Sequence, residues 1–176
     1  GATGIYVVLA PFALIVALGF LSYKQRPYLA AVLYAALTSL IGVMLSSIAV
    51  KAGSDAAFAS DAVTSLVVSA GMFAGLAFVG WTTKRDLSGW GTFLAAALWG
   101  LILAMVVNVI AGSTLAGFLI NAAAVLLFSA MTAYDLQTAM RSAHLGMSAA
   151  VVCALSLYLD FLNLFTSILG LSHADD

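Results

Sequence analysis

The run from Ala154 to Gly170, ALSLYLDFLNLFTSILG, is apolar enough to be the core of a membrane-spanning helix, yet it carries Asp160 near its middle. A charged Asp at the centre of a bilayer costs about 2.5–3.5 kcal/mol on insertion scales, so such a residue normally faces protein or water. Ser156, Asp160, Asn163 and Ser167 follow one another at intervals of four, three and four residues and therefore share one helical face. A helix with such a polar stripe needs partners elsewhere in the chain.

The composition is that of a membrane protein. Hydrophobic residues make up 64% of the chain and charged residues 7%, whereas soluble domains have roughly 45–50% and 25%. The seven acidic residues are all Asp, and with six Lys or Arg the net charge is −1, so the chain has no basic patch for a nucleic acid. Cys153 is alone, which excludes an intrachain disulfide and a cysteine metal site. No cofactor is expected.

Several apolar runs approach the length of about 20 residues that a membrane span requires. We expect six spans: Ile5–Ser22, Tyr28–Val50, Ala62–Thr82, Leu87–Ala111, Leu115–Tyr134 and Met147–Leu171. The connections are short and hold no soluble domain, so residues 1–176 are predicted to form one all-α transmembrane helical bundle. Frequent Gly and Ala indicate close helix packing.

The basic residues predict how the bundle is oriented. Five of them fall in connections on one side of the membrane: Lys24, Arg26, Lys84, Arg85 and Arg141. The other side has Lys51. Because Lys and Arg concentrate in cytoplasmic loops, the five are expected to face the cytoplasm and the C-terminus to lie outside a multi-pass protein.

Aspartates near the ends of the spans have simpler interpretations. Asp86 precedes the fourth span and is predicted to be its N-cap. Asp55 and Asp61 are assigned to a solvated loop, with Asp61 a possible cap of the third span. The two His residues are far apart in sequence and suggest no metal cluster.

The last two spans each contribute an acid. Asp135, in MTAYDLQTAMR, lies at the expected end of the fifth span, and Asp160 lies deeper in the sixth. The chain turns around near Ser142–Gly146, so the two helices are expected to be antiparallel neighbours. A rise of about 1.5 Å per residue puts the acids at depths that differ by on the order of 10 Å. Direct contact therefore requires a tilt, a broken helix or a turn that is shorter on one side; otherwise Asp135 sits in the headgroup region.

Three segments resemble the signature segments of a known family. They are FVGWTTKRDLSGWGTFL (Phe78–Leu94), LLFSAMTAYDLQ (Leu126–Gln137) and ALSLYLDFLNLF (Ala154–Phe165). These are similar to the bacterial branch of the transmembrane Bax inhibitor motif family, and the similarity extends over essentially the whole chain. The resemblance implies a bundle of seven helices with the last helix at its centre. With six spans expected, we expect the family's first helix to be absent from this chain.

The resemblance also implies a pH-sensitive calcium leak in the bacterial inner membrane. Paired aspartates on the last two helices are the proton sensor in that family, and they match Asp135 and Asp160. A basic residue at the cytoplasmic end of the family's second helix latches the closed state onto the first aspartate. Lys24 lies nearest that position, with Arg26 as the other candidate. Lys would make a weaker latch because it lacks the bidentate fork of Arg.

The chemistry of such a pair suits cation passage. Calcium takes six to eight oxygen ligands, of which two carboxylates supply at most four, so Asn163, carbonyls and water would complete the shell. We expect weak binding of calcium at Asp135 and Asp160. Our hypothesis is that a shared proton favours the closed pore and that its loss frees the carboxylates for a cation.

The residues also bear on two other classes of function. An intramembrane aspartyl protease needs its second Asp in a GxGD context, whereas Asp160 stands in LYLD, and a membrane zinc hydrolase needs a His pair that the chain lacks. An enzyme is therefore not expected. The main alternative is a non-conducting protein of the stress or cell-death suppressor type, which would regulate other membrane proteins and use the acids to fix helix packing.

Overall fold

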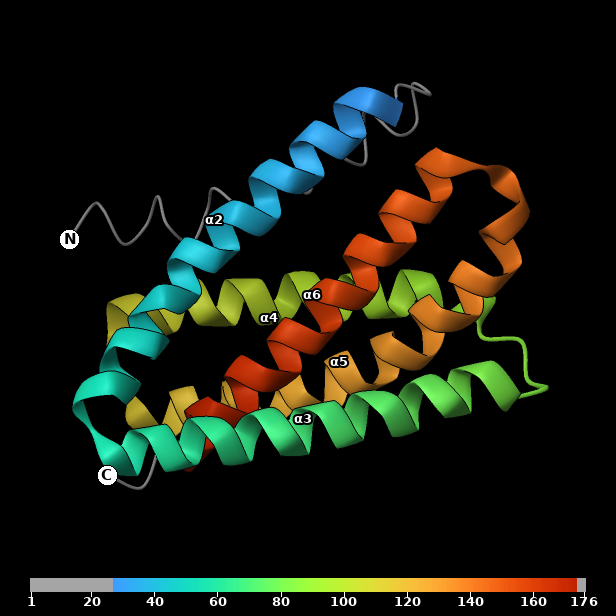
Figure 1. Cartoon of the computed structure of the whole chain (residues 1–176). Helices are drawn as coiled ribbons and strands as arrows, with labels where there is room; N and C mark the ends of the chain where they lie inside the picture. Colours follow the sequence, from blue (N-terminus) through green and yellow to red (C-terminus); the bar gives the residue numbers. More distant parts are fainter. Residues whose placement is uncertain (1–26, 174–176) are drawn as a thin grey trace.

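The computed structural model describes residues 27–173, and this part of the chain is helical apart from short connections (Figure 1). Its elements are α2 (Pro27–Ser54), α3 (Ala56–Thr82), the 3₁₀ turn η1 (Ser88–Trp90), α4 (Gly91–Ala111), α5 (Thr114–Ser142), the 3₁₀ turn η2 (Ala143–Leu145) and α6 (Met147–Ser172). All five α-helices are long and apolar enough to cross a membrane. The predicted span Ile5–Ser22 and the candidate latch residues Lys24 and Arg26 lie outside the described residues.

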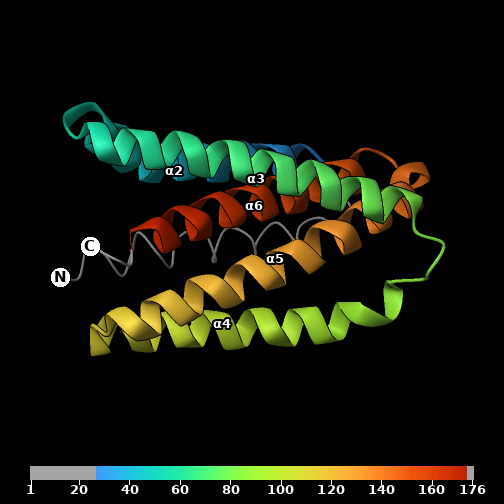
Figure 2. The ribbon, with the colours of Figure 1, turned by 90° about the horizontal axis from the view of Figure 1, so that it is seen from below.

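Helix α6 is the centre of the bundle, as predicted. It packs against α2, α3 and α5, whereas α4 packs on α5. In Figure 2, α6 lies between the α2–α3 pair and the α4–α5 pair. Of its most apolar stretch 28% is buried, against 11–12% for the other four helices. A helix enclosed in this way can carry polar side chains that would be costly against lipid.

The connection between α2 and α3 is shorter than expected. Helix α2 runs to Ser54 and α3 begins at Ala56, so Asp55 alone joins them. The Asp55 Oδ1 accepts hydrogen bonds from the backbone N–H groups of Ala57 (3.0 Å) and Phe58 (3.1 Å). Because this cap satisfies two free N–H groups, α3 starts at the cap and not where the apolar run starts. The assignment of Asp61 to a loop or a cap is therefore wrong; it lies inside α3.

Helix α5 is longer than its apolar run. It continues beyond Tyr134 to Ser142, so the expected end of the fifth span at Tyr134 is wrong. The added turns are rich in Leu, Gln, Ala, Met and Arg, which favour helix even in water. In this region α3 approaches α5 very closely, because a Cβ on Gly80 would lie 2.5 Å from the carbonyl oxygen of Ala133. Small residues permit such contacts in membranes.

Candidate functional site: an aspartate pair between the last two helices

The joint between α5 and α6 removes most of the expected difference in depth between the two acids. The helical path continues from α5 through η2, and the chain reverses at Gly146, whose φ of 92° favours glycine. Gly146 lies eleven residues after Asp135 and fourteen before Asp160, a difference of about three residues or ~4.5 Å of helix rise. Figure 1 also shows α5 and α6 inclined to each other and joined through η2. The connection thus takes up fewer residues on the α6 side of the reversal than on the α5 side, and the axes of α5 and α6 are inclined to each other.

Asp135 and Asp160 meet between the two helices. The Asp135 side chain interacts directly with the side chains of Asp160 and Ser156. Asp160 is only 1% exposed, and Asp135 is partly buried. Asp135 therefore faces α6, and the structure brings together the two acids and the serine that the polar stripe contains.

The Asp160 carboxyl is poorly satisfied. Its Oδ2 atom is buried and has no hydrogen-bond partner among the described residues. Of those residues, the ones that act electrostatically on the pair are Ser156 and the opposite aspartate. A buried carboxylate without donors or a counter-charge is expensive. A proton held between the carboxyls removes that cost, and so does a cation.

Several other polar side chains of the interior, among them Asn163, Ser69 and Thr132, donate hydrogen bonds within their own helices. Asn163 Nδ2 donates to the carbonyl of Leu159 at 2.8 Å, and Ser167 is buried one turn further along α6. Ser65 and Ser69 of α3 and Thr132 of α5 are also buried. Thr132 lies three residues before Asp135 on the same face of α5. Hydroxyl groups that donate to a helix carbonyl keep lone pairs that can still accept or coordinate.

The described residues offer limited means of holding a metal. Among them, no three His, Cys, Asp or Glu side chains gather at one point. The predicted ligands Asp135 and Asp160 together have four carboxylate oxygens, fewer than the six to eight that calcium takes. The two carboxylates alone therefore do not complete the coordination shell of a calcium ion.

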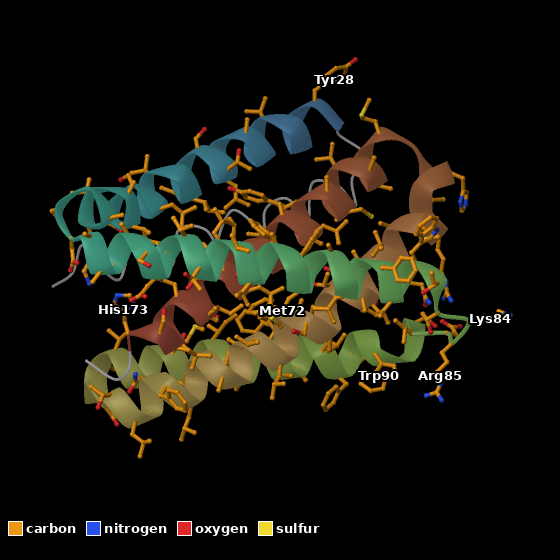
Figure 3. The ribbon with its side chains drawn as sticks, turned by 60° about the horizontal axis from the view of Figure 1, so that its bottom comes forward. Tyr28, Met72, Lys84, Arg85, Trp90 and His173 are labelled. Atoms are coloured by element: carbon orange, nitrogen blue, oxygen red, sulfur yellow. The ribbon has the colours of Figure 1, made fainter. Side chains whose placement is uncertain are left out.

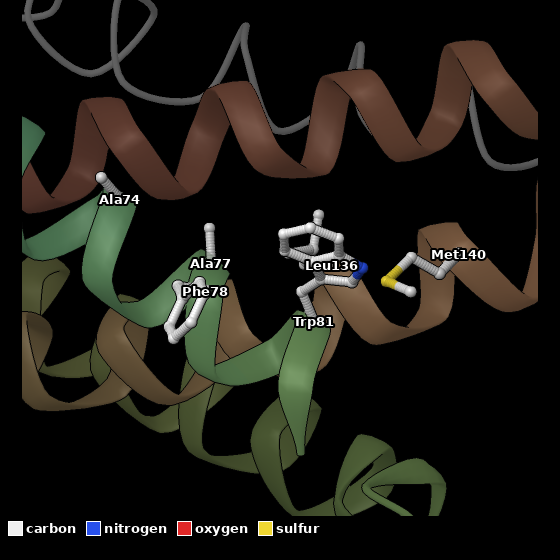
Figure 4. Close-up of a pocket in the computed structure, with 6 residues that line it drawn as sticks. All are labelled: Ala74, Ala77, Phe78, Trp81, Leu136 and Met140. Carbon is white, nitrogen blue, oxygen red and sulfur yellow. The ribbon is translucent and has the colours of Figure 1, made fainter. Parts of the chain in front are cut away.

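An apolar groove of about 480 Å³ lies between α3 and α5 but is not part of this site (Figure 4). Its lining residues are Ala74, Ala77, Phe78, Trp81, Leu136 and Met140. Phe78 and Trp81 are exposed on the surface of the bundle. A surface groove without a polar lining residue suits lipid chains and not an ion.

One residue near the pair, Gln137, was not singled out from the sequence. It is 8% exposed, its Nε2 donates to the Arg85 carbonyl at 2.9 Å, and its Oε1 accepts from the Leu87 N–H at 2.9 Å. The motif YD-x-Q contains this residue, but a single Gln does not indicate partners about fifty positions away. Gln137 ties the α3–α4 connection to α5.

Asp86 has a different role from the one predicted. Helix α4 begins at Gly91 after η1, so Asp86 does not cap it. Instead, the Asp86 Oδ1 accepts hydrogen bonds from the Ser88 N–H (2.9 Å) and from Arg141 Nη1 (2.6 Å). Hydrogen bonds from the backbone and hydroxyl of Ser88 and from Arg141 lower the pKa of Asp86 to about 2. This exposed carboxylate stays charged at physiological pH.

Three of the four Lys and Arg residues in the described part of the chain gather at one end of the bundle. Lys84 and Arg85 lie at the end opposite His173 (Figure 3). Arg141 reaches the same end because it pairs with Asp86. Lys51 is at the last turn of α2, where it stacks over the Phe58 ring, 4.2 Å from the ring centroid.

The fold and this site define an all-helical integral membrane protein with an ionisable pair in its interior. The chain belongs to the Bax inhibitor-1 family, because the family model described as inhibitor of apoptosis-promoting Bax1 matches residues 2–174. The family resemblance seen in the sequence motifs is thereby confirmed.

Bacterial relatives agree with this assignment. The chain is 34% identical over 171 residues to the inner membrane protein YbhL of Escherichia coli (strain K12), covering 93% of this chain and 71% of YbhL. It is 37% identical over 179 residues to a protein of Caulobacter vibrioides, covering 97% and 70% of the two chains. A Deinococcus radiodurans protein is 34% identical over 176 residues, with coverage of 97% and 74%.

Proposed function

We propose that this chain is a pH-sensitive calcium leak channel of the bacterial inner membrane, in which Asp135 and Asp160 sense protons and gate the passage of cations. The observation that carries the proposal is the buried Asp160 carboxyl, which contacts a second acid and has one oxygen without a hydrogen-bond partner among the described residues. The name of YbhL supports the location. The end with Lys84 and Arg85 then faces the cytoplasm, which puts the C-terminus outside.

The gate works through the number of protons on the pair. One shared proton allows a hydrogen bond between the two carboxyls, which holds α5 and α6 together. Two unit charges 4 Å apart repel by about 4 kcal/mol at an effective dielectric constant of 20, several times the ~1 kcal/mol net value of a hydrogen bond. Loss of the proton therefore separates the carboxylates or draws in a divalent cation. The pore is closed at acid pH and conducts as the pH rises.

The neighbouring oxygens make the pair suitable for transient contact with calcium. Ser156 lies beside Asp135, and Asn163 is one turn beyond Asp160 on the same stripe. With water, these groups complete a shell that the two carboxylates cannot fill alone. Weak binding of this kind permits release. In the same proposal Lys24, or Arg26, acts as the latch that stabilises the closed state on Asp135.

The test is calcium flux into liposomes that contain the purified protein, measured from about pH 5 to about pH 8. Wild-type flux is expected to rise with pH, and Asp160→Asn, which cannot lose a proton, is expected to remove this dependence. Asp86→Asn is the matched control, since it makes the same substitution at an exposed acid. Wild-type flux and pH dependence in the Asp160→Asn variant would refute the proposal.

The second candidate is a non-conducting regulator that binds other membrane proteins. The description of the matching family, an inhibitor of apoptosis-promoting Bax1, favours it. In such a protein the aspartate pair would only fix the packing of α5 on α6. Folded protein that passes no calcium at any pH in liposomes would select this function over the channel.

A further inference from the structure

The segment of α5 that carries Asp135 presents a second face, away from α6. Tyr134, Gln137 and Arg141 are three and four residues apart and so lie on one side of the helix. All three contact the α3–α4 connection or the start of α4. The acid is thus on one face of a helical segment whose other face is attached to a neighbouring part of the bundle.

Gln137 makes the buried part of this attachment. Its amide donates to the carbonyl of Arg85 and accepts from the N–H of Leu87, bridging two backbone groups on either side of one residue. A primary amide can donate and accept at once, which a carboxylate or an apolar side chain cannot. At 8% exposure, these bonds are largely shielded from competing water.

The contacts on either side of Gln137 are less restrictive. The Tyr134 hydroxyl lies against Gly91, where a Cβ would approach it to 2.5 Å. Arg141 and Asp86 form an ion pair whose side chains are 50% and 65% exposed, and such pairs contribute little to rigidity. Gln137 is therefore the residue on this face that fixes the position of α5 most strongly.

We infer that Gln137 is a positioning residue for the aspartate pair: by clamping α5 to the α3–α4 connection, it holds Asp135 against Asp160 and sets the pH at which the channel opens. The inference rests on the proposed channel function. The two carboxyls can share a proton only while α5 keeps its register against α6. If α5 is held less firmly, the contact between the two carboxyls in the closed state is weaker. The shared proton is then lost at a lower pH.

The other described charged groups at this end of the bundle do not change when Gln137 is replaced by a neutral residue. They are Lys84, Arg85 and Asp86 in the α3–α4 connection and Arg141 at the end of α5, together with the titratable His144 in η2. Asp135 and Asp160 face each other from α5 and α6. A shifted pH response in such a variant would therefore report the position of Asp135 and not a new charge.

The experiment compares calcium flux against pH for the wild type, Gln137→Met and Thr138→Ala in the same liposomes. Met keeps the length and volume of Gln but makes neither hydrogen bond. We expect the pH at which its flux is half-maximal, the flux midpoint, to fall by about one unit. A tenfold higher proton concentration is then needed to reduce the flux by half. Thr138 is an exposed neighbour whose side chain makes none of these contacts, so its variant is expected to keep the wild-type midpoint.

A merely structural role gives a different result. In that case Gln137→Met lowers the melting temperature or the total flux and leaves the midpoint in place, which overturns the inference. If Asp160→Asn still abolishes the pH response in that experiment, the channel function stands without the clamp. Wild-type protein without flux at any pH removes the channel function and the inference together. Gln137→Ala repeats the test with a second side chain, and it must shift the midpoint in the same direction.

Discussion

Aspartates in two regions of this protein have opposite surroundings. Asp86 at the end of the bundle is 65% exposed and accepts hydrogen bonds from a backbone N–H and an Arg, whereas Asp160 at the centre is 1% exposed and has an oxygen without a partner among the described residues. An acid with donors keeps its charge and serves the structure. An acid that lacks them needs a proton or a cation. Under the proposed function, only the second kind couples pH to the passage of an ion.

The largest effect is expected when the central pair itself is changed. Asp135→Asn and Asp160→Asn are each expected to abolish the pH dependence of calcium flux, and the double variant is expected to add nothing further. In the proposed mechanism the two acids share one proton, so removing either member removes the function of both. Initial flux rates across the pH range provide the measurement. Additive effects in the double variant would show that the acids act separately.

The next largest effect concerns the packing that brings α5 into place. Gly80→Ala puts a Cβ 2.5 Å from the Ala133 carbonyl oxygen, a backbone atom that cannot move away alone. We expect a destabilisation of about 1–3 kcal/mol, measured by thermal unfolding in detergent. Gly75→Ala is the control because nothing lies within 4 Å of its Cβ, and it is expected to stabilise α3 by ~0.5–1 kcal/mol. Equal melting temperatures for the two variants would contradict the close contact.

A smaller effect is expected at the other end of the bundle, where Asp55 caps α3. Asp55→Ala removes the acceptor of two backbone N–H groups and is expected to cost about 1 kcal/mol of stability. The flux midpoint is expected to stay unchanged, because this acid is structural. Asp55→Asn keeps a capping oxygen and serves as the control. A shifted midpoint in either variant would break the division between structural and sensing aspartates.

The smallest effect is expected for Asp86→Asn. The pKa of Asp86 is lowered from 3.8 to about 2, so its stabilising charge is fully present above pH 3.8 and is lost as the pH falls toward 2. Between about pH 5 and about pH 8 the substitution therefore removes a charge without introducing any pH dependence. Any loss of melting temperature is expected to be small and to fade in high salt, because exposed ion pairs are screened. A pH-dependent loss in this range would mean that Asp86 titrates with the pair.

Much of this arrangement could be predicted from the apolar runs and the polar stripe. The five described helices, the central position of the last one and the shared face of Ser156, Asp160 and Asn163 follow from hydropathy, family resemblance and helical spacing. Helix ends were harder, because Asp55 starts α3 by hydrogen bonding and α5 continues in residues that favour helix without being apolar. Hydropathy detects neither the hydrogen bonds of a helix cap nor the helix propensity of residues that are not apolar.

The contact between the two acids depended on details that spacing does not contain. Counting from the middle of the turn placed Asp135 and Asp160 too far apart, because η2 lengthens the α5 side and α6 starts directly after Gly146. The partners of Gln137 are backbone groups in a distant connection. Every residue of that connection has a backbone carbonyl, and every residue except proline has a backbone N–H. No pattern of side chains in the sequence therefore indicates the two hydrogen bonds of Gln137.

The enclosed position of α6 has a consequence for biosynthesis. Helices α2, α3 and α5, which surround it, all precede it in the chain and leave the ribosome first. Until α6 enters the membrane, Asp135 has no acid opposite, and the faces of α3 and α5 that pack against α6 are uncovered. Assembly of the bundle is therefore completed by the insertion of the span that carries Asp160, and a nascent chain that stops before α6 leaves the face of α5 that carries Asp135 open to lipid and to membrane proteases.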